Sequence, residues 1–234
     1  MFKEKMHMQI AEKYPYRIEL HAHTSPASGC SQVKPEDVVT VFHNAGYDGI
    51  AITNHFYPRP DEDGFLEIYR NDFLKALQTG EKLGIKVYLG AELRFPNQND
   101  NDYLIFGFEL SQLEEMYSYT ETSLETFVKN FKTDDMFLLQ AHPFRNNMMR
   151  GFEQYLDGFE VFNMHPNHNS RVALAAKYAT ENGKIATAGT DYHHIGHDNL
   201  CATRTAILPQ NSHELVTLLK SKDFIYEIAG KLVL

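Results

Sequence analysis

The segment RIELHAHTS, residues 17–25, places two histidines two positions apart directly after a short apolar run. Side chains at positions i and i+2 of a strand point to the same side. If residues 17–20 form a strand that continues into His21, then His21 and His23 can be directed at one point in space. An isolated H-x-H pair is equally typical of a polar strand end with two solvated imidazoles, so the rest of the chain has to distinguish the two interpretations.

The bulk composition is that of a globular protein with a sizeable core. The chain has 234 residues, of which 43% are hydrophobic and 23% are charged, and α/β barrels of this size commonly form one unit. We therefore predict a single domain over residues 1–234. The net charge of −9 argues against a broad nucleic-acid-binding surface, although bound cations could still create a site for an anionic substrate.

Several features favour an intracellular protein. The two cysteines, Cys30 and Cys201, are too few for a disulfide framework and suit a reducing compartment. Charged residues interrupt the N-terminal segment, which therefore lacks the apolar stretch of a signal peptide. No apolar run approaches the roughly 20 residues that span a bilayer. We expect cytoplasmic localisation and no membrane partner, and the sequence leaves the oligomeric state open.

Apolar strand-like runs alternate with helical patterns along the chain. Strands are predicted at residues 17–20, 49–53, 85–90, 103–107, 136–140, 158–162, 184–188, 205–208 and 224–228. Helices are predicted at residues 35–46, 65–83, 124–131, 170–182 and 215–219. This alternation favours βαβ units with a parallel sheet, and about seven such units indicate an α/β TIM-like barrel, with an open doubly wound sheet as the alternative. Neither a G-x-G-x-x-G motif nor a P-loop follows any strand, which argues against the usual nucleotide-binding folds.

Residues of metal-ligand type follow the ends of the predicted strands, where barrel enzymes build their active sites. In chain order they are His21, His23, His55, Glu92, His142, Asn163, His165, Asp191 and His193. Each one alone could be a cap, a turn residue or a solvated side chain, but scattered surface residues would have no reason to prefer strand ends. The joint pattern therefore predicts a metal site at the C-terminal ends of the strands. Asp102 is the exception because it precedes its strand, and His168, His194 and His197 are interpreted as parts of polar loops.

Five motifs in this order resemble those of the PHP (polymerase and histidinol phosphatase) family. They are HAHT at residues 21–24, TNH at 53–55, GAE at 90–92, AHPFR at 141–145 and GTDYHH at 189–194. The resemblance implies a distorted (β/α)7 barrel with up to three metal ions at its C-terminal face, and a metal-dependent phosphoesterase activity. The loops look too short for a capping domain, so the expected substrate is a small phosphomonoester such as histidinol phosphate or a nucleotide.

The resemblance also implies roles for the ligand residues. The ions would be held by three overlapping groups: His21, His23, Glu92 and Asp191 in the first, Glu92 and His142 with a ligand near residue 103 in the second, and His55 with His193 in the third. Two or three divalent ions, Mn, Zn or Fe, are therefore expected. Glu92, His55 and His193 would be catalytic through a metal-bound hydroxide.

Hydrolysis of a phosphate ester is a reaction that would use such a set of metal ligands. Two ions about 3.5–4 Å apart can clamp the attacking and leaving oxygens of an in-line displacement, and a bridging carboxylate such as Glu92 sets that spacing. Arg145 could place its planar guanidinium on a phosphoryl oxygen, although a surface salt bridge explains it equally well. Asn163 and His165 are further candidates for binding the substrate.

The sequence departs from the family pattern at two positions. Where the family has a histidine before the fourth strand, this chain has Asp102, in the segment NQNDND. A carboxylate ligand there would favour Mn²⁺ over Zn²⁺, and a plain turn is the competing interpretation. Some members also have a histidine shortly after H-x-H, where this chain has ASGCS. Cys30 could act there as a thiolate, but a turn of small residues is favoured, which leaves the third site open.

Two other functions fit parts of the pattern. Metal-dependent amidohydrolases also carry H-x-H after the first barrel strand and an aspartate after the last. They bridge two ions through a modified lysine or a carboxylate after strand four, whereas Glu92 follows strand three and no lysine ends a middle strand. The other alternative is a non-catalytic PHP module, against which the nearly complete set of ligands argues.

Overall fold

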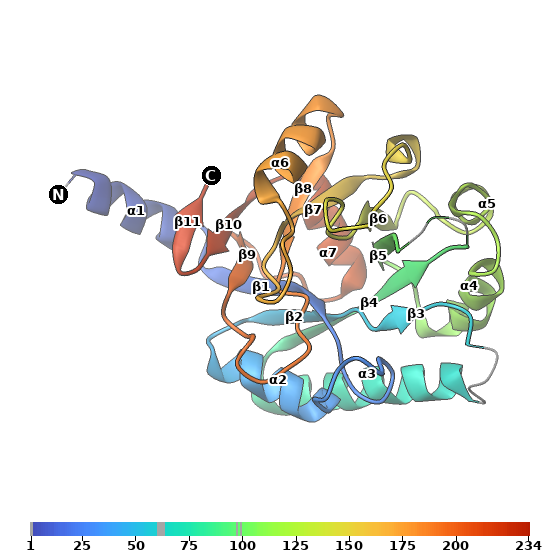
Figure 1. The fold of residues 1–234 in the computed structure, drawn as a ribbon. Coiled ribbons are helices and arrows are strands. Elements are labelled where there is room, and N and C mark those ends of the chain that lie inside the picture. Colours follow the sequence, from blue (N-terminus) through green and yellow to red (C-terminus); the bar gives the residue numbers. More distant parts are fainter. Residues whose placement is uncertain (1, 60–63, 97, 99) are drawn as a thin grey trace.

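The chain adopts an α/β fold in which one sheet curls upon itself (Figure 1). The computed structural model describes residues 2–59, 64–96, 98 and 100–234, and for residues 2–7 the backbone alone. The strands are β1 (Tyr16–Ala22), β2 (Gly49–Ile52), β3 (His55–Phe56), β4 (Lys86–Arg94), β5 (Asp102–Phe106), β6 (Phe137–Gln140), β7 (Gly158–Asn163), β8 (Ile185–Gly189), β9 (Cys201–Thr205), β10 (Phe224–Ile228) and β11 (Lys231–Val233). The helices are α1 (Phe2–Lys13), α2 (Pro35–Asn44), α3 (Phe65–Leu83), α4 (Leu113–Tyr119), α5 (Leu124–Asn130), α6 (Val172–Glu181) and α7 (Ser212–Ser221), with short 3-10 helices η1 (Leu110–Gln112) and η2 (Glu153–Tyr155).

The sheet contains two parallel sets of strands joined by one reversed strand. Its order is β11-β10-β9-β1-β2-β4-β5-β6-β7-β8, with β3 paired to β4. Strands β1, β2 and β4 are parallel, as are β6, β7 and β8. Strand β5 is antiparallel to both of its neighbours, and β9, β10 and β11 also pair in antiparallel fashion. The predicted α/β class is confirmed, but the expectation of a parallel sheet holds only within the two sets.

Most predicted elements are present. The first seven predicted strands correspond to β1, β2, β4, β5, β6, β7 and β8, with ends that differ by at most a few residues. The strand predicted at 205–208 is wrong, because β9 ends at Thr205. The short strands β3 and β11 and the helices α1 and α4 were not predicted. Among the described residues, no helix is long and apolar enough to cross a membrane.

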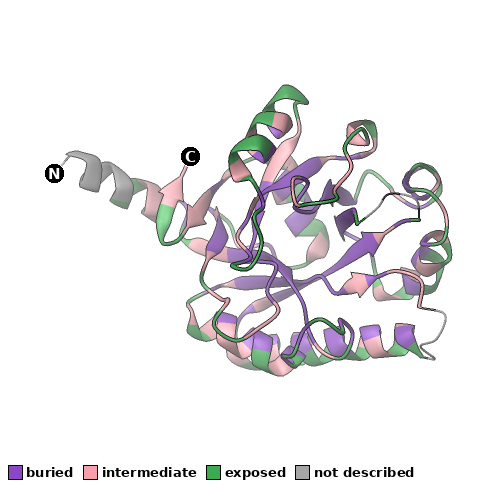
Figure 2. Ribbon diagram, in the orientation of Figure 1, coloured by how far each residue is buried: buried purple, intermediate pink, exposed green. Residues whose placement is uncertain are grey.

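The two faces of the curled sheet have separate apolar cores. The inner core joins the inward side chains of β1, β2, β4, β5 and β6 to α7, which begins at the cap Asn211 and packs against β4, β5 and β6. The outer core includes Val87 and Leu89 of β4 and the buried faces of α2, α3, α5 and α6. The strands are largely buried, while these outer helices expose one face (Figure 2). Alternation along β4 therefore directs Tyr88 and Glu92 to the inner face.

A bulge in β1 directs the H-x-H pair inward. The pairing of β1 with β2 shifts register between Glu19 and Ala22. Ile18, before the shift, and Leu20, within it, belong to the inner core, whereas Ala22, after the shift, belongs to the outer core. The extra residue therefore exchanges the two faces of the strand. His21, which also lies within the shifted stretch, consequently faces Glu92 on the inside of the curl.

Candidate metal centre

Four buried side chains at the rim of the curl converge on one point. Nε2 of His21 lies 3.1 Å from Nε2 of His23, 3.2 Å from Oε1 of Glu92 and 3.4 Å from Oδ1 of Asp191. Nε2 of His23 lies 3.3 Å from Oε2 of Glu92 and 3.3 Å from Oδ1 of Asp191. Ligand atoms about 2.0–2.1 Å from a tetrahedral ion are separated by about 3.3–3.4 Å. His21, His23 and Glu92 therefore form a group that could hold one divalent cation, with Asp191 beside both histidines, and the ligand roles of the four residues stay a prediction.

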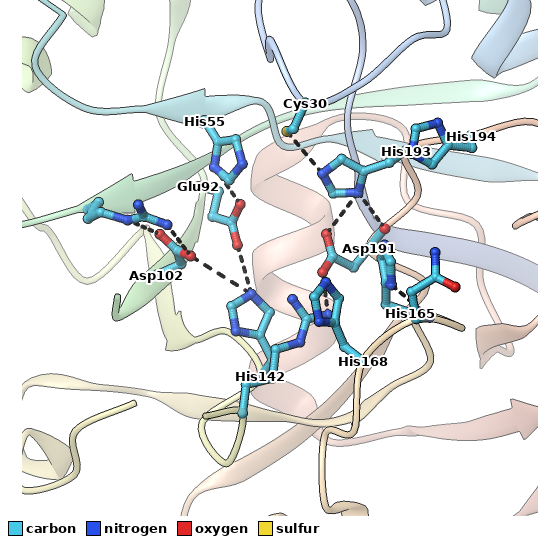
Figure 3. Close-up of a pocket in the computed structure, with 13 residues that line it drawn as sticks. Cys30, His55, Glu92, Asp102, His142, His165, His168, Asp191, His193 and His194 are labelled. Carbon is cyan, nitrogen blue, oxygen red and sulfur yellow. Dashed lines mark hydrogen bonds and ion pairs between the residues drawn. The ribbon is translucent and has the colours of Figure 1, made fainter. Parts of the chain in front are cut away.

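Glu92 also belongs to a second group of ligand atoms (Figure 3). Its Oε1 atom lies 3.2 Å from Nε2 of His142, and its Oε2 atom lies 2.8 Å from Nδ1 of His55. Among the described residues, Glu92 Oε2 and His55 Nδ1 have no hydrogen-bond partner in spite of their proximity. Two buried polar atoms that face each other without a hydrogen bond are costly, and a cation between them would satisfy both. The predicted bridging position of Glu92 is compatible with this geometry.

The reversal of β5 explains why Asp102 precedes its strand. Asp102 pairs with Arg94 at the end of β4, so the start of β5 lies at the same rim as the ends of the parallel strands. Asp102 is buried, and its Oδ2 atom lies 4.0 Å from Nε2 of His142. It also forms a two-pronged ion pair with Arg94, at 2.8 and 2.9 Å, which the sequence did not suggest. Asp102 is therefore a strand residue and not part of a plain turn, and its role as a ligand stays a prediction.

Cys30 joins the histidines expected to hold a third ion. Its Sγ atom lies 3.1 Å from Nε2 of His193, and one ligand atom from each of His23, Cys30, His55 and His193 lies within 4.8 Å of the others. Burial acts to raise the pKa of the Cys30 thiol, but hydrogen bonds with His193 and His55 lower that pKa to about 6. Cys30 does lie in a turn, as expected, yet its thiol faces the site.

The electrostatics keep the acids of the centre ionised. Burial acts to raise the pKa of both Glu92 and Asp191, but the charge of the nearby His21 opposes it and holds both well below their usual range. Burial lowers the pKa of His23, and the neighbouring His193 and His55 lower it further. A neutral imidazole beside two carboxylates is the donor set that binds a divalent transition metal.

Two of the predicted ligand residues have unusual backbone conformations. His142 has φ 31° and Asp191 has φ 55°, values that are uncommon for residues other than glycine. Such conformations cost of order 1–3 kcal/mol and gather at functional sites, where the surrounding structure holds them in place. The observation supports a functional rather than an ordinary loop role for both residues.

Two of the three predicted substrate-binding residues line the pocket, and the third lies behind it. Arg145 and His165 line a pocket of 370 Å³ over the ligand cluster, and the Arg145 Nη2 atom lies 2.5 Å from Oδ2 of Asp191. The ion pair of Arg145 is therefore partly buried at the wall of the pocket and does not lie on the open surface. Asn163 is not among the described residues that line this pocket. Its Oδ1 atom accepts hydrogen bonds from Arg145 and Ser170, at 2.6 and 3.0 Å.

Two loop histidines that the sequence analysis interpreted as polar-loop residues also line the pocket. His168 and His194 contribute to its wall, and the ring of His168 lies 4.5 Å from that of His165. The sequence did contain a signal for this placement, because His194 follows Asp191 in the motif GTDYHH and His168 lies three positions after His165.

Two buried acids were missed altogether. Glu160 of β7 lies with its Oε1 atom 2.9 Å from Nδ1 of His21, and Glu19 of β1 accepts hydrogen bonds from the backbone N–H groups of His21 and Thr190, both at 2.8 Å. An acidic residue inside an otherwise apolar strand, as in GFEVF and RIEL, was the signal that could have revealed them.

Comparisons with known proteins place this arrangement in a family. The structure resembles a two-domain protein from Bacteroides vulgatus that contains a predicted PHP-like metal-dependent phosphoesterase, with a TM-score of 0.69 and 15% identity over 93% of this chain; the match spans 66% of that chain. It also resembles a proposed metal-dependent phosphoesterase from Bifidobacterium adolescentis, with a TM-score of 0.52 and 16% identity over 86% of this chain and 95% of that one. An amidohydrolase from Chromobacterium violaceum, with bound sulfate and no metal, gives a TM-score of 0.53 and 14% identity over 77% of this chain and 89% of that one.

At these identities the structural similarities establish the fold alone. No curated protein matches the sequence. The model of the PHP domain family, however, matches residues 19–229, a range that contains every predicted ligand residue. The chain therefore belongs to the PHP domain family.

Proposed function

We propose that this protein is a metal-dependent phosphoesterase that hydrolyses a small phosphomonoester on a distorted (β/α)7 barrel. The observation that carries the proposal is the position of Glu92, because each of its two oxygens faces one proposed ligand of the first ion and one proposed ligand of another ion. Oε1 faces His21 and His142, and Oε2 faces His23 and His55. A carboxylate shared in this way would hold two ions close together, the arrangement that stabilises in-line attack on phosphorus.

We assign different roles in the proposed reaction to the residues of the centre. Divalent ions, when bound, would supply the positive charge that activates water and neutralises phosphoryl oxygens. His21, His23, Glu92, Asp191, His142 and Asp102 are the proposed ligands of the first two, with His55, His193 and Cys30 for a third. Arg145, fixed between Asn163 and Asp191, would orient a phosphoryl oxygen. His165, at the wall of the pocket, would contact the rest of the substrate.

The size of the pocket favours a small substrate. Its volume of 370 Å³ and that of an adjoining cavity of 550 Å³, which shares Asp102, His142 and Arg145 with it, both lie within the range for small-molecule sites, about 300–1,000 Å³. Histidinol phosphate and a nucleotide both remain candidates within this class.

Amide hydrolysis is the second candidate, because one structural neighbour is an amidohydrolase. The two reactions separate in an assay of the purified chain with Mn²⁺, Zn²⁺ or Fe²⁺, in which phosphate release from phosphomonoesters is compared with hydrolysis of amides. We expect metal-dependent phosphate release. Hydrolysis of amides without release of phosphate would instead identify an amidohydrolase, and neither activity with any metal would favour a non-catalytic module.

Glu92→Gln tests the shared carboxylate itself. The substitution keeps the size of the side chain but removes a negative charge from both ion positions, so we expect phosphatase activity to fall at least 100-fold and at least one metal ion per chain to be lost. Glu125→Gln, at an exposed position in α5, is the control and should change neither. Near-normal turnover with full metal content in Glu92→Gln would refute the bridging role.

A further inference from the structure

A buried carboxylate lies directly behind the ligand cluster, on the side away from the pocket. Glu160 of β7 is 1% exposed, and its Oε1 atom lies 2.9 Å from Nδ1 of His21. The other ring nitrogen of His21, Nε2, is the atom that faces Glu92 and Asp191. A carboxylate accepts but cannot donate, so in the neutral imidazole that binds a metal ion this contact holds the ring proton on Nδ1 and leaves the lone pair of Nε2 for the ion.

The second oxygen of Glu160 reaches a different part of the centre. Its Oε2 atom accepts hydrogen bonds from the backbone N–H of His142 at 3.0 Å and from the side-chain amide of Asn163 at 2.9 Å. His142 has the strained φ of 31°, and a hydrogen bond from its own N–H helps to hold that conformation. One side chain thus touches a proposed ligand of the first ion and a proposed ligand of the second.

The neighbouring strand leaves room for this contact. A Cβ atom at Gly189 would lie 2.3 Å from Oε1 of Glu160 and 2.6 Å from Cβ of His21, distances that no real Cβ atom tolerates. The absence of a side chain at Gly189 is therefore what lets Glu160 and His21 meet. Glu19, the other buried acid nearby, bonds the backbone N–H of His21 and not its ring.

We propose that Glu160 is a positioning residue of the metal centre, which fixes the tautomer of His21 and the backbone of His142 and so prepares ligands of two ions at once. This inference rests on the proposed function in so far as it requires a metal centre. It goes beyond that function because it gives a role in arranging the metal ligands to Glu160, a residue that would contact neither metal nor substrate.

The amide Glu160→Gln provides a stringent test, because Glu160 accepts three N–H donors. A glutamine has one acceptor oxygen and one donor group. If its oxygen faces His21, its NH₂ group opposes the N–H groups of His142 and Asn163. If it is turned around, its NH₂ group donates to Nδ1 of His21 and moves the ring proton to Nε2, the metal-facing atom. Either orientation damages one of the two ligand groups.

The experiment measures Zn²⁺ affinity and stoichiometry by competition with a chromophoric chelator at pH 8. We expect Glu160→Gln to bind Zn²⁺ about 10–100-fold more weakly, the usual effect of losing a partner of a metal ligand. Glu19→Gln is the matched control: it changes a buried acid that also touches His21, but through the backbone N–H and not through the ring. It should change Zn²⁺ affinity only a few-fold.

A second readout distinguishes positioning from mere loss of charge or fold. In the Zn²⁺-loaded wild-type chain, the Nδ1 proton of His21 should appear in ¹⁵N-edited NMR spectra as a strongly hydrogen-bonded resonance, and it should move or vanish in Glu160→Gln. If that variant does not fold, Glu160→Asp, which keeps the charge but withdraws the oxygens, should show the same effects to a smaller degree. Unchanged affinity and an unchanged resonance in a folded variant would overturn the inference. Loss of Zn²⁺ affinity in Glu160→Gln from a chain that hydrolyses no phosphate ester would leave the positioning role intact and refute only the proposed function.

Discussion

At the scale of single residues, the candidate metal centre offers side chains of different hardness. Asp102 offers a hard carboxylate oxygen held in place by Arg94, whereas Cys30 offers a soft sulfur at the opposite side, beside His193. Oxygen ligands suit Mn²⁺, and thiolates suit Zn²⁺ or Fe. At the two positions where this chain departs from its family, Asp102 therefore favours Mn²⁺ and Cys30 favours Zn²⁺ or Fe. Each preference can be tested separately.

Substitutions of Asp102 test whether this residue is a ligand of the second ion. We expect Asp102→Ala to lose one bound metal and to reduce turnover sharply, and Asp102→His to retain the metal with a preference shifted toward Zn²⁺, because imidazole suits zinc. Metal analysis of the purified variants together with phosphatase rates measures both effects. Asp100→Ala, at an exposed position of the same segment, is the control. Normal occupancy and turnover in Asp102→Ala would show that the carboxylate serves only its pair with Arg94.

The Cys30 thiol should be unusually reactive in metal-free protein. Its pKa is lowered to about 6, so the thiolate predominates above about pH 6, and alkylation by iodoacetamide should reach half of its maximal rate near that pH. Cys201 is an internal control, because burial raises its pKa well above the usual value. We further expect Zn²⁺ to protect Cys30 from alkylation. A rate that rises only near pH 9, or one that Zn²⁺ leaves unchanged, would contradict a ligand role for the thiolate.

At the scale of elements, sequence periodicity located most of the strands but not their directions. The run YLIFG predicted a strand, and β5 is there, but nothing in an apolar run of this length shows that it is reversed. The position of Asp102 before its strand was the one anomaly that this reversal explains. The bulge in β1 was equally hidden, since a single extra residue changes pairing without changing composition. The H-x-H spacing nevertheless predicted correctly that His21 and His23 meet.

Strand β9 and the buried Glu160 were missed for the same physical reason. Strand β9 follows the loop of His193 to His197 and pairs with β1 in antiparallel fashion, and its register depends on partners distant in sequence. Glu160 was missed for the same reason, because its importance lies in a contact with His21 that is 139 positions away. Residue types at strand ends could be predicted, whereas the hydrogen bonds behind them depend on tertiary packing.

At the scale of the whole molecule, the metal centre is where distant segments of the curled sheet are joined. Backbone hydrogen bonds connect His23 and His21 at the end of β1 with Tyr192 after β8, at 2.9 and 3.1 Å, and Glu92 enters from β4. The first ion would thus link three segments that are far apart in sequence. Such an ion stabilises the fold by mass action, because the unfolded chain does not present its ligands together.

The size of that stabilisation can be stated in advance. At a free ion concentration 100 times the dissociation constant, one site contributes about 2.7 kcal/mol, and in a protein of this size each kcal/mol raises Tm by about 2–4 °C. Chelation should therefore lower Tm by about 5–10 °C for each ion removed, and Mn²⁺, Fe²⁺ or Zn²⁺ should restore it in calorimetry. Glu92→Gln, in which the shared ligand is weakened, should show a smaller response to the same metals. The contradicting outcome is that metal-free and metal-loaded wild-type protein melt at the same temperature. In that case a bound ion does not stabilise the curled sheet, and the proposed linkage between β1, β4 and the segment after β8 is wrong.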